Sequence, residues 1–259
     1  MPKPDKGWTV TPGRLGLRLQ PASSPLFDET WLILSMLLTG TAATAGVLAL
    51  LLPLAWPFVA TVLLPLVIIY GIALWGLSDH PHTHFGPANI ITALRAAMVC
   101  LTASTFVWFE GLASAPTALW ILIGFVLAAL SLDGVDGYLA RRFRQQSAYG
   151  ARFDMEVDAF LILVLSAAAV LLGKAGPWVL LIGAMRYGFV VVGWMVPRLT
   201  RPLFASTRRK LVCVLQILSL CVLLLPVVTP PVSMVIAATA LAALVYSFAV
   251  DTLSLLRRP

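Results

Sequence analysis

Residues 133–158 read DGVDGYLARRFRQQSAYGARFDMEVD. Five of the eleven acidic residues of the chain lie in this stretch, and four of them are aspartates set into or beside long apolar runs: Asp133, Asp136, Asp154 and Asp158. A carboxylate in apolar surroundings costs several kcal/mol unless a cation or hydrogen-bond donors compensate it. Four such groups in one short stretch predict the functional centre of the protein.

The composition around this stretch is that of an integral membrane protein. Of the 259 residues, 60% are hydrophobic and 11% are charged, whereas soluble domains have about 25% charged residues. The mean hydropathy is +0.94. These values place the chain in a membrane before any motif is considered.

Apolar stretches of about 20 residues, the length that crosses ~30 Å of hydrocarbon as a helix, recur eight times. They cover residues 31–52, 58–77, 88–109, 118–141, 153–173, 178–197, 210–229 and 232–256. The predicted fold class is therefore an all-α polytopic membrane protein with eight transmembrane helices.

The basic residues cluster in segments that lie on one side of the membrane if the spans alternate. These residues are Lys3, Lys6, Arg14, Arg18, Arg142, Arg144, Arg152, Arg198, Arg201, Arg208, Arg209, Lys210, Arg257 and Arg258. The positive-inside rule then predicts that both termini and the acidic stretch are cytoplasmic, and we expect a bacterial inner membrane. Basic residues that face anionic lipid headgroups on the cytoplasmic side explain the net charge of +7 better than binding to a nucleic acid does.

Four segments follow from this reading: a cytoplasmic tail at 1–30, an extra transmembrane hairpin at 31–77, a juxtamembrane loop at 78–87 and a six-helix core at 88–259. The hairpin spans have no charged side chain, so we expect the acidic site to form without them. The loop contains His80, His82 and His84, but Pro81 prevents the regular helix on which metal ligands are spaced i, i+3 or i, i+4. Contact with lipid phosphates is the favoured interpretation of these histidines.

Helical geometry brings the four aspartates to two faces. One helix face, an arc of roughly 140° at the end of the fourth span, carries Asp133, Asp136, Gly137, Ala140 and Arg141. A stripe of about 80° at the start of the fifth span carries Gly150, Asp154 and Asp158, while Glu156 points away. A connection of about ten residues allows the two helices to run antiparallel, and we expect the acidic faces to meet near the membrane surface.

Converging carboxylates repel one another unless cations bind between them. Ligand sets made only of oxygen suit hard divalent ions, and Mg²⁺ is commonly shared between carboxylates and substrate phosphates. We therefore predict two divalent ions, Mg²⁺ or Mn²⁺, beside a diphosphate. The small residues Gly137, Ala140 and Gly150 would let a large ligand approach the backbone, although close packing of helices also explains small residues in membranes.

The spacing Asp-x₂-Asp-Gly-x₂-Ala-Arg-x₈-Gly-x₃-Asp-x₃-Asp resembles the signature of the CDP-alcohol phosphatidyltransferase family. All eight positions are present at the expected separations. A second stretch, Pro87-Ala-Asn-Ile-Ile-Thr-Ala-Leu-Arg95, is similar to the segment that opens the first core helix of the family, although Ala88 interrupts the usual Pro-Asn pair. The resemblance covers the six spans from residue 87 to 256 and leaves out the tail and the first two spans.

The resemblance implies a six-helix catalytic core and a reaction in phospholipid synthesis. An acceptor hydroxyl attacks the β-phosphorus of a CDP-linked lipid, such as CDP-diacylglycerol, and CMP is released. It also implies that Asp133, Asp136 and Asp154 hold the metal ions, and that Asp158 is the general base and also touches a metal. The implied binding residues for the CDP-lipid are Gly137, Ala140, Arg141, Gly150, Asn89, Thr92 and Arg95.

Two features bear on the acceptor alcohol. Arg186 lies near the middle of a span, where an unpaired guanidinium is costly, so we expect it to face the interior of the bundle. A polar cluster at residues 206–210 opens the next span, and it would either bind an acceptor phosphate or fix the orientation of the helix in the membrane. The candidate acceptor residues are therefore Arg186, Ser206, Arg208, Arg209 and Lys210. Glycerol 3-phosphate is the expected acceptor because a widespread branch of the resembled family uses it, and inositol phosphate and serine are alternatives.

Two other classes of protein fit this pattern less well. An ion transporter would place its acidic residues near the bilayer midplane and would not require Gly137 or the Ala140-Arg141 pair. A membrane prenyltransferase that uses Mg²⁺ would have acidic clusters far apart in sequence, whereas here one short connection separates them. The sequence leaves open whether the chain forms a homodimer.

Overall fold

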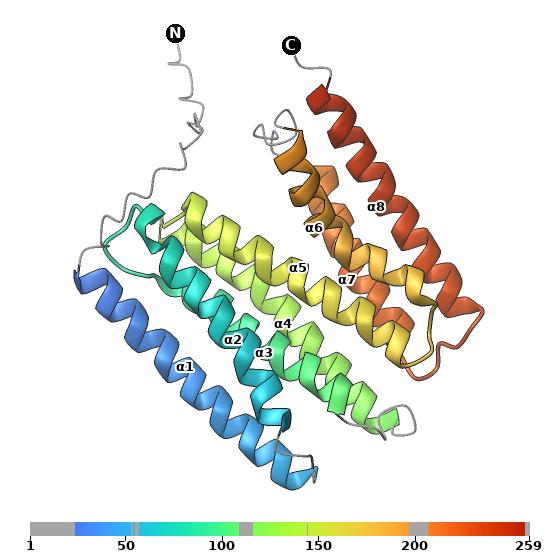
Figure 1. Cartoon of the computed structure of the whole chain (residues 1–259), viewed down its shortest axis with the longest axis horizontal. Helices are drawn as coiled ribbons and strands as arrows, with labels where there is room; N and C mark the ends of the chain where they lie inside the picture. The colour runs from blue at the N-terminus through green and yellow to red at the C-terminus, as the bar shows by residue number, and fades with distance from the viewer. Residues whose placement is uncertain are drawn as a thin grey trace.

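The structure of the protein is a computed structural model that describes residues 24–52, 54, 57–108, 116–143, 145–196 and 207–256. Within these residues the chain is helical and has no strand (Figure 1). The helices are α1 (Ser24–Leu51), α2 (Pro57–Trp75), the 3₁₀ turn η1 (Gly76–Asp79), α3 (Pro87–Trp108), α4 (Pro116–Arg142), α5 (Ala148–Leu171), the 3₁₀ turn η3 (Pro177–Val179), α6 (Leu180–Met195), α7 (Thr207–Leu224) and α8 (Val232–Leu256).

The eight predicted spans correspond in position to the eight long helices of this part of the chain, and the all-α polytopic fold class is confirmed. The bounds differ by five residues or more at three ends, one of them the start of α5 at Ala148. α1 begins at Ser24, so the last residues of the predicted tail are helical, with Pro25 in the first turn, where a missing N–H costs nothing. α7 ends at Leu224, five residues before the predicted end of its span, and three prolines follow it at 226, 230 and 231.

Five helical segments are long and apolar enough to cross a membrane, and they contain α1, α2, α3, α4 and α8. α6 and α7 are apolar but shorter. α5 has 24 residues, but its first three turns carry the charged residues Arg152, Asp154, Glu156 and Asp158. These charged residues interrupt the apolar sequence of α5, so α5 is not uniformly apolar as a simple membrane anchor would be.

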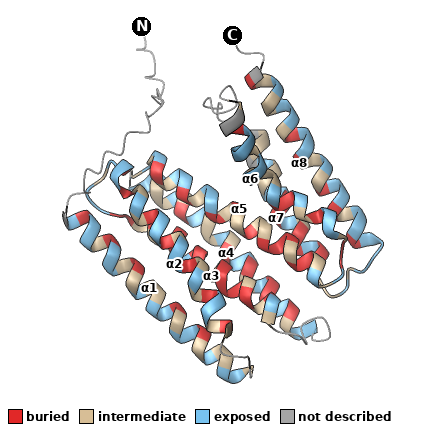
Figure 2. Cartoon of the chain, in the orientation of Figure 1, coloured by how far each residue is buried: buried red, intermediate tan, exposed pale blue. Residues whose placement is uncertain are grey.

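α3 is the central helix of the first half of the bundle. It packs against α1, α2, α4 and α5. Of its most apolar stretch of 18 residues, 61% is buried, whereas 17% of the corresponding stretch of α1 is buried. Figure 2 shows buried residues concentrated on α3 and the facing sides of its neighbours, with exposed residues along the outer helices. The outer faces are apolar, as expected of surfaces that contact lipid.

α5 connects this half to the second one, because it also packs against α6 and α7, and α7 packs against α8. Gly183 of α6 makes a close crossing possible, since a Cβ there would lie 2.5 Å from Leu163 Cα of α5. At the end of α5 remote from the aspartates, Lys174 Nζ donates to the carbonyls of Leu225 and Val228 at 2.9 and 2.6 Å. These bonds tie the α5–α6 connection to the α7–α8 connection.

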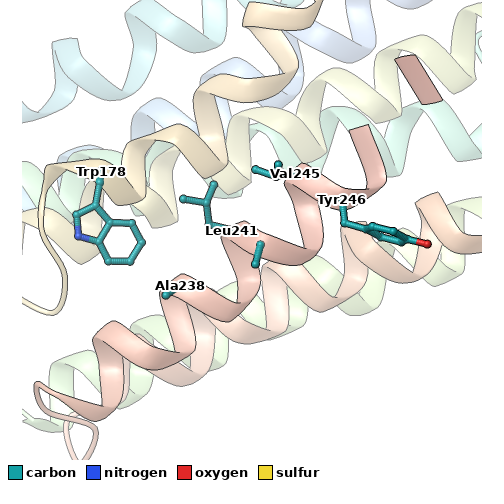
Figure 3. Close-up of a pocket in the computed structure, with 6 residues that line it drawn as sticks. Trp178, Ala238, Leu241, Val245 and Tyr246 are labelled. Atoms are coloured by element: carbon teal, nitrogen blue, oxygen red, sulfur yellow. The ribbon is translucent and has the colours of Figure 1, made fainter. Parts of the chain in front are cut away.

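An open apolar pocket lies between α8 and the turn η3 that precedes α6 (Figure 3). Its lining residues are Trp178, Ala238, Leu241, Ala242, Val245 and Tyr246. It contains none of the aspartates and no charged side chain. The candidate site therefore has to be built from the polar side chains and not from this pocket.

Candidate active site

The four signature aspartates come from the last turns of α4 and the first turns of α5, as the helical pattern predicts. Their two helices do not simply pack face to face, because α3 packs against both of them. The sequence predicts a direct meeting of the two acidic faces. The structure adds a third helix between them, and its Arg95 supplies the positive charge at the centre.

Arg95 contacts all four carboxylates. Its Nη1 donates to Asp136 Oδ2 at 3.1 Å and to Asp154 Oδ1 at 2.6 Å, and it lies 3.1 Å from Asp133 Oδ1. Its Nη2 donates to Asp158 Oδ1 at 2.5 Å. The Arg95 side chain is 1% exposed, so these contacts form away from water, where charge pairs are strong and unpaired charges are costly.

Asp136 differs from the other three aspartates. Its side chain is 6% exposed, and it accepts a second hydrogen bond from Thr92 Oγ1 at 3.1 Å. Asp136 lies three residues after Asp133, a rotation of about 300° around the helix axis, so the two side chains point in directions about 60° apart. Asp136 points toward α3. Asp136 therefore joins α4 to α3.

The remaining carboxylates form a group suited to a cation. Asp133, Asp154 and Asp158 each offer one oxygen, and these oxygens lie within 4.8 Å of one another. If all four aspartates are ionised, the one positive charge of Arg95 leaves three negative charges in excess. An oxygen-only donor set with excess negative charge fits a hard divalent cation. This grouping differs from the predicted one, which assigned the metal chiefly to Asp133, Asp136 and Asp154.

Gly150 is a place of close approach between α5 and α3. A Cβ on Gly150 would lie 2.8 Å from Asn89 Oδ1 and 3.2 Å from Ser147 Oγ. Asn89 is itself held by a bond from Nδ2 to the Phe85 carbonyl at 2.6 Å. The missing side chain at Gly150 therefore accommodates Asn89, so close packing explains this glycine directly.

The rest of the predicted CDP-lipid residues lie around the same centre. Thr92 and Arg95 contact the aspartates from α3, and Arg141 is exposed at the end of α4. A Cβ on Gly137 would lie 3.4 Å from Arg141 Nη1, which is ordinary van der Waals contact. Ala140 is half-buried on the same helix.

Two of the predicted acceptor residues, Arg186 and Arg208, pair with carboxylates. Arg186 Nη2 donates to Glu156 Oε1 at 2.5 Å, and the Arg186 side chain is 31% exposed. Arg208 donates from Nη2 to Asp251 Oδ1 at 2.5 Å and from Nη1 to the Ser247 carbonyl at 2.6 Å.

Of the other acceptor candidates, Arg209 is half-buried, and Lys210 lies in the first turn of α7. Ser206 lies outside the described residues.

Asp251 and the partner of Glu156 are not among the residues that the sequence singles out. A signal for Asp251 was available, because it is the one acidic residue in the last apolar span and an acid at such a position requires a cation. Glu156 was expected on the opposite face from Asp154 and Asp158, and that face is where Arg186 of α6 meets α5. The pairing of particular residues depends on the order of helices in space, which no local pattern contains.

Comparison with known proteins gives a family match over the helices that form this site. The model of the CDP-alcohol phosphatidyltransferase family matches residues 85–248, more than half of the chain. No solved structure matches the chain.

Two curated relatives have names of the same kind. The chain is 33% identical over 95 residues to a CDP-diacylglycerol--glycerol-3-phosphate 3-phosphatidyltransferase from Cereibacter sphaeroides, a match that covers 36% of this chain and 40% of the relative. It is 35% identical over 103 residues to a cardiolipin synthase (CMP-forming) from Oryza sativa subsp. japonica, covering 38% of this chain and 30% of the relative. The chain thus spans less than half the length of either relative. The extent of the family match, over the segment that carries all four aspartates and Arg95, shows that the chain belongs to the CDP-alcohol phosphatidyltransferase family.

Proposed function

We propose that the protein transfers a phosphatidyl group from a CDP-linked lipid, such as CDP-diacylglycerol, to the hydroxyl of an alcohol and releases CMP, as a step of phospholipid synthesis. The observation that supports this most is the convergence of four signature carboxylates from α4 and α5 on one buried guanidinium of α3. Family membership and the names of both relatives favour the same reaction over an ion transporter or a prenyltransferase.

The proposed reaction exchanges one P–O bond for another. The acceptor oxygen forms a bond to the β-phosphorus, the one that carries the lipid. The bond between the β-phosphorus and the bridging oxygen breaks, and this oxygen keeps the electron pair and leaves on the α-phosphorus as part of CMP. The hydroxyl proton of the acceptor has to be removed as the new bond forms, so the site needs a base close to the β-phosphate.

We assign the base role to Asp158. Arg95 occupies Oδ1 of this carboxylate, which leaves its second oxygen to take the proton. The side chain is 18% exposed, so Asp158 is partly accessible, unlike the more deeply buried Asp136. Asp158 also lies one helical turn beyond Asp154, on the same face of α5.

Asp133, Asp154 and Asp158 would hold divalent cations, with Asp136 bound to α3 beside them; two ions, Mg²⁺ or Mn²⁺, would match the diphosphate. Bound cations would supply charge neutralisation at the diphosphate. Arg95 keeps the three metal-holding carboxylates at their mutual distances. Asn89, Gly137, Ala140, Arg141 and Gly150 would contact the nucleotide end of the donor lipid.

For the acceptor we propose glycerol 3-phosphate, the acceptor in the name of the Cereibacter sphaeroides relative. A phosphorylated acceptor brings about two negative charges to a site that already holds a diphosphate, so it requires fixed cations nearby. Arg186 is the best-described candidate, since it lies on α6 and pairs with Glu156 of the helix that carries Asp154 and Asp158.

The proposed orientation places the aspartates and both termini on the cytoplasmic side of a bacterial inner membrane. The basic residues at the end of α4 and at the start of α7 support this placement, by the positive-inside rule. Nucleotide-linked lipid and soluble acceptor would then reach the site from the same compartment.

CMP release tests the proposal. Purified protein in detergent or vesicles is incubated with CDP-diacylglycerol, Mg²⁺ or Mn²⁺, and glycerol 3-phosphate, inositol phosphate, serine or phosphatidylglycerol as acceptor. We expect acceptor-dependent CMP release that excess chelator abolishes and that Asp154→Asn removes. Full release in chelator would exclude the metal assignment, and no release with any acceptor would exclude the transfer reaction.

Asp158→Asn separates the base from a metal ligand. Loss of a general base is expected to slow turnover by about 10²-fold or more while binding of the CDP-lipid stays close to that of wild type. Equilibrium binding of a non-reacting CDP-lipid, measured beside the rate of CMP release, checks this. Parallel loss of binding and turnover would show that Asp158 mainly holds metal or substrate.

A further inference from the structure

The segment that joins the hairpin to the core folds onto the start of α5. His80 is 9% exposed and its Nε2 lies 3.0 Å from the carbonyl oxygen of His84. Gly86, with φ +83, leaves the space that the side chain of Gln145 fills, because a Cβ there would lie 2.6 Å from Gln145 Oε1. His82 Nε2 adds a long contact of 3.4 Å to the carbonyl of Gln146.

The hydrogen bonds of His80 and Ser147 are consistent in direction. A carbonyl only accepts, so Nε2 of His80 carries the hydrogen, and Nδ1 of a neutral imidazole is an acceptor. Nδ1 lies 3.5 Å from Ser147 Oγ, whose hydroxyl can donate to it. The same Oγ accepts from the backbone N–H of Gly150 at 2.9 Å, so Ser147 is the N-cap of α5. Burial lowers the pKa of His80, which favours the neutral form that this arrangement requires.

Tyr149 provides a second connection between the same two parts of the chain. It is 6% exposed, and its hydroxyl donates to the carbonyl of Ala73 at the end of α2 at 2.9 Å. The His80 ring meets the Tyr149 ring edge to face, with centroids 5.1 Å apart. A Cβ on Gly76 would lie 3.4 Å from the Tyr149 ring, so the turn after α2 also packs closely against this ring. Ala73, Gly76 and His80 all precede residue 85, where the family match begins.

We propose that His80 is a positioning residue for phosphatidyl transfer: together with Tyr149 it fixes the first turn of α5, and through that turn the places of Gly150 and Asp154. The inference rests on the proposed function, because α5 carries part of the donor site. The additional hairpin is then an integral support of the site, in contrast to the independent hairpin that the sequence predicts.

The geometry of α5 shows why its first turn matters. Gly150 approaches Asn89 of α3 so closely that no Cβ fits between them. Asp154 lies one turn later and is bound to Arg95 at 2.6 Å. A small tilt of the first turn therefore changes both the nucleotide end of the site and one metal-holding carboxylate, without removing any group that takes part in the reaction.

Four variants test the inference in the full chain. His80→Phe keeps an aromatic ring against Tyr149 but loses both nitrogens. His80→Gln keeps a donor for the His84 carbonyl and a neutral acceptor. Tyr149→Phe removes only the bond to Ala73. His84→Gln is the matched control, because His80 contacts the backbone oxygen of His84 and the His84 side chain is 71% exposed.

Two measurements are made on each variant. Hydrogen–deuterium exchange reports on the amides of residues 147–154, and CMP release against CDP-diacylglycerol concentration gives KM and kcat at saturating metal ion and acceptor. We expect His80→Phe and Tyr149→Phe to exchange faster over these residues. Their KM for the CDP-lipid should rise roughly five-fold, with kcat within about two-fold of wild type. His80→Gln should recover most of both effects, and His84→Gln should match wild type.

The two measurements keep this inference separate from the proposed function. Unchanged exchange in His80→Phe and Tyr149→Phe would overturn the inference, whether or not the protein releases CMP. Faster exchange with unchanged KM would also overturn it, since the first turn would then not matter for transfer. If wild type releases no CMP with any acceptor, the proposed function fails and takes with it the role of His80 in transfer.

Discussion

The guanidinium of Arg95 has three nitrogen atoms, and all three are used. Nε donates to the carbonyl of Ala129 on α4 at 3.1 Å, while Nη1 and Nη2 contact the carboxylates of α4 and α5. A planar group with fixed donors holds several carboxylates in defined directions, which the flexible ammonium of a lysine does not. The sequence predicts that Arg95 contacts the CDP-lipid, and its observed contacts suit it to organise the four carboxylates.

Arg95→Gln is expected to destabilise the protein most when divalent ions are absent. Removing the cation leaves several carboxylates uncompensated at a buried site, which typically costs about 3–5 kcal/mol. The carboxylates are partly exposed, so we expect the lower part of this range. Thermal unfolding in detergent, with chelator and with Mg²⁺ or Mn²⁺, measures the effect.

The metal ion should recover more stability in Arg95→Gln than in wild type, because a cation replaces part of the lost charge. Arg142→Gln, an exposed arginine at the end of α4, is the control and should unfold like wild type. Equal unfolding temperatures for Arg95→Gln and wild type in chelator would show that Arg95 is not the main counter-ion.

Arg186 and Glu156 test the class of acceptor. If the acceptor carries a phosphate, Arg186→Gln should raise its KM by about tenfold or more, as expected for loss of a charged hydrogen bond. Glu156→Gln removes the carboxylate that now competes for Arg186, so it should leave this KM unchanged or lower it. The KM for the CDP-lipid should change much less in both variants. Wild-type values for Arg186→Gln would mean that its role is to pair with Glu156.

At the scale of elements, the site depends on a close contact between α3 and the first turn of α5. The two glycines 134 and 150 illustrate the difference between a required and a tolerated glycine. Gly150 faces Asn89 and Ser147, whereas a Cβ on Gly134 of α4 would meet nothing within 4 Å. Both lie in helices, where glycine is otherwise less favourable than alanine by about 0.5–1 kcal/mol.

Gly150→Ala should therefore lower stability by about 1–3 kcal/mol, the usual cost of an inserted methyl group in a packed contact. It should also raise the KM for the CDP-lipid, since Asn89 has to move. Gly134→Ala is the matched control and should be neutral or slightly stabilising. Unfolding and CMP-release assays on the two variants decide the point, and identical behaviour would argue that α3 and α5 are not in close contact at Gly150.

At the scale of the whole molecule, the polytopic arrangement predicts that the connections lie alternately on the two sides of the membrane. Gln146 lies in the exposed α4–α5 connection beside the aspartates, and Val227 is 74% exposed in the α7–α8 connection. With the native Cys100, Cys213 and Cys221 replaced by alanine, single cysteines at these two positions report their side.

We expect a membrane-impermeant maleimide to label Val227→Cys in intact spheroplasts and Gln146→Cys only after permeabilisation. The positive-inside rule is the physical basis, because the basic residues flank the α4–α5 connection. Labelling in the reverse order would place the aspartates outside the cytoplasm.

The sequence predicts the order and approximate bounds of the helices because each is a long apolar run, and membrane crossing leaves few other solutions. It also places the four aspartates on two helix faces, since helical periodicity alone determines this. The position of Arg95 between those faces was not predictable in the same way. It depends on α3 lying between α4 and α5, and the sequence contains no local record of which helix becomes the neighbour of which.

The sequence does not predict the contacts between the hairpin and α5, for a related reason. Tyr149 looks like one more aromatic residue beside the signature, and Ala73 contributes only a backbone carbonyl, which has no sequence signal. The segment with three histidines was interpreted through its side-chain chemistry, while its structural role lies in the buried ring of His80. Such pairings come from tertiary packing, and a single sequence does not reveal them.

The place of Arg95 in the chain has a consequence for biogenesis. α3 is synthesised before α4 and α5, so the counter-charge reaches the bilayer ahead of all four aspartates. When α4 leaves the translocon, Asp133 and Asp136 can pair with a cation that is already in place, and α5 follows with Asp154 and Asp158. Each acidic helix then enters the membrane beside a partner, which reduces the cost of burying its charges. A chain that carried the same residues in the opposite order would have to insert four acidic side chains before their arginine arrived.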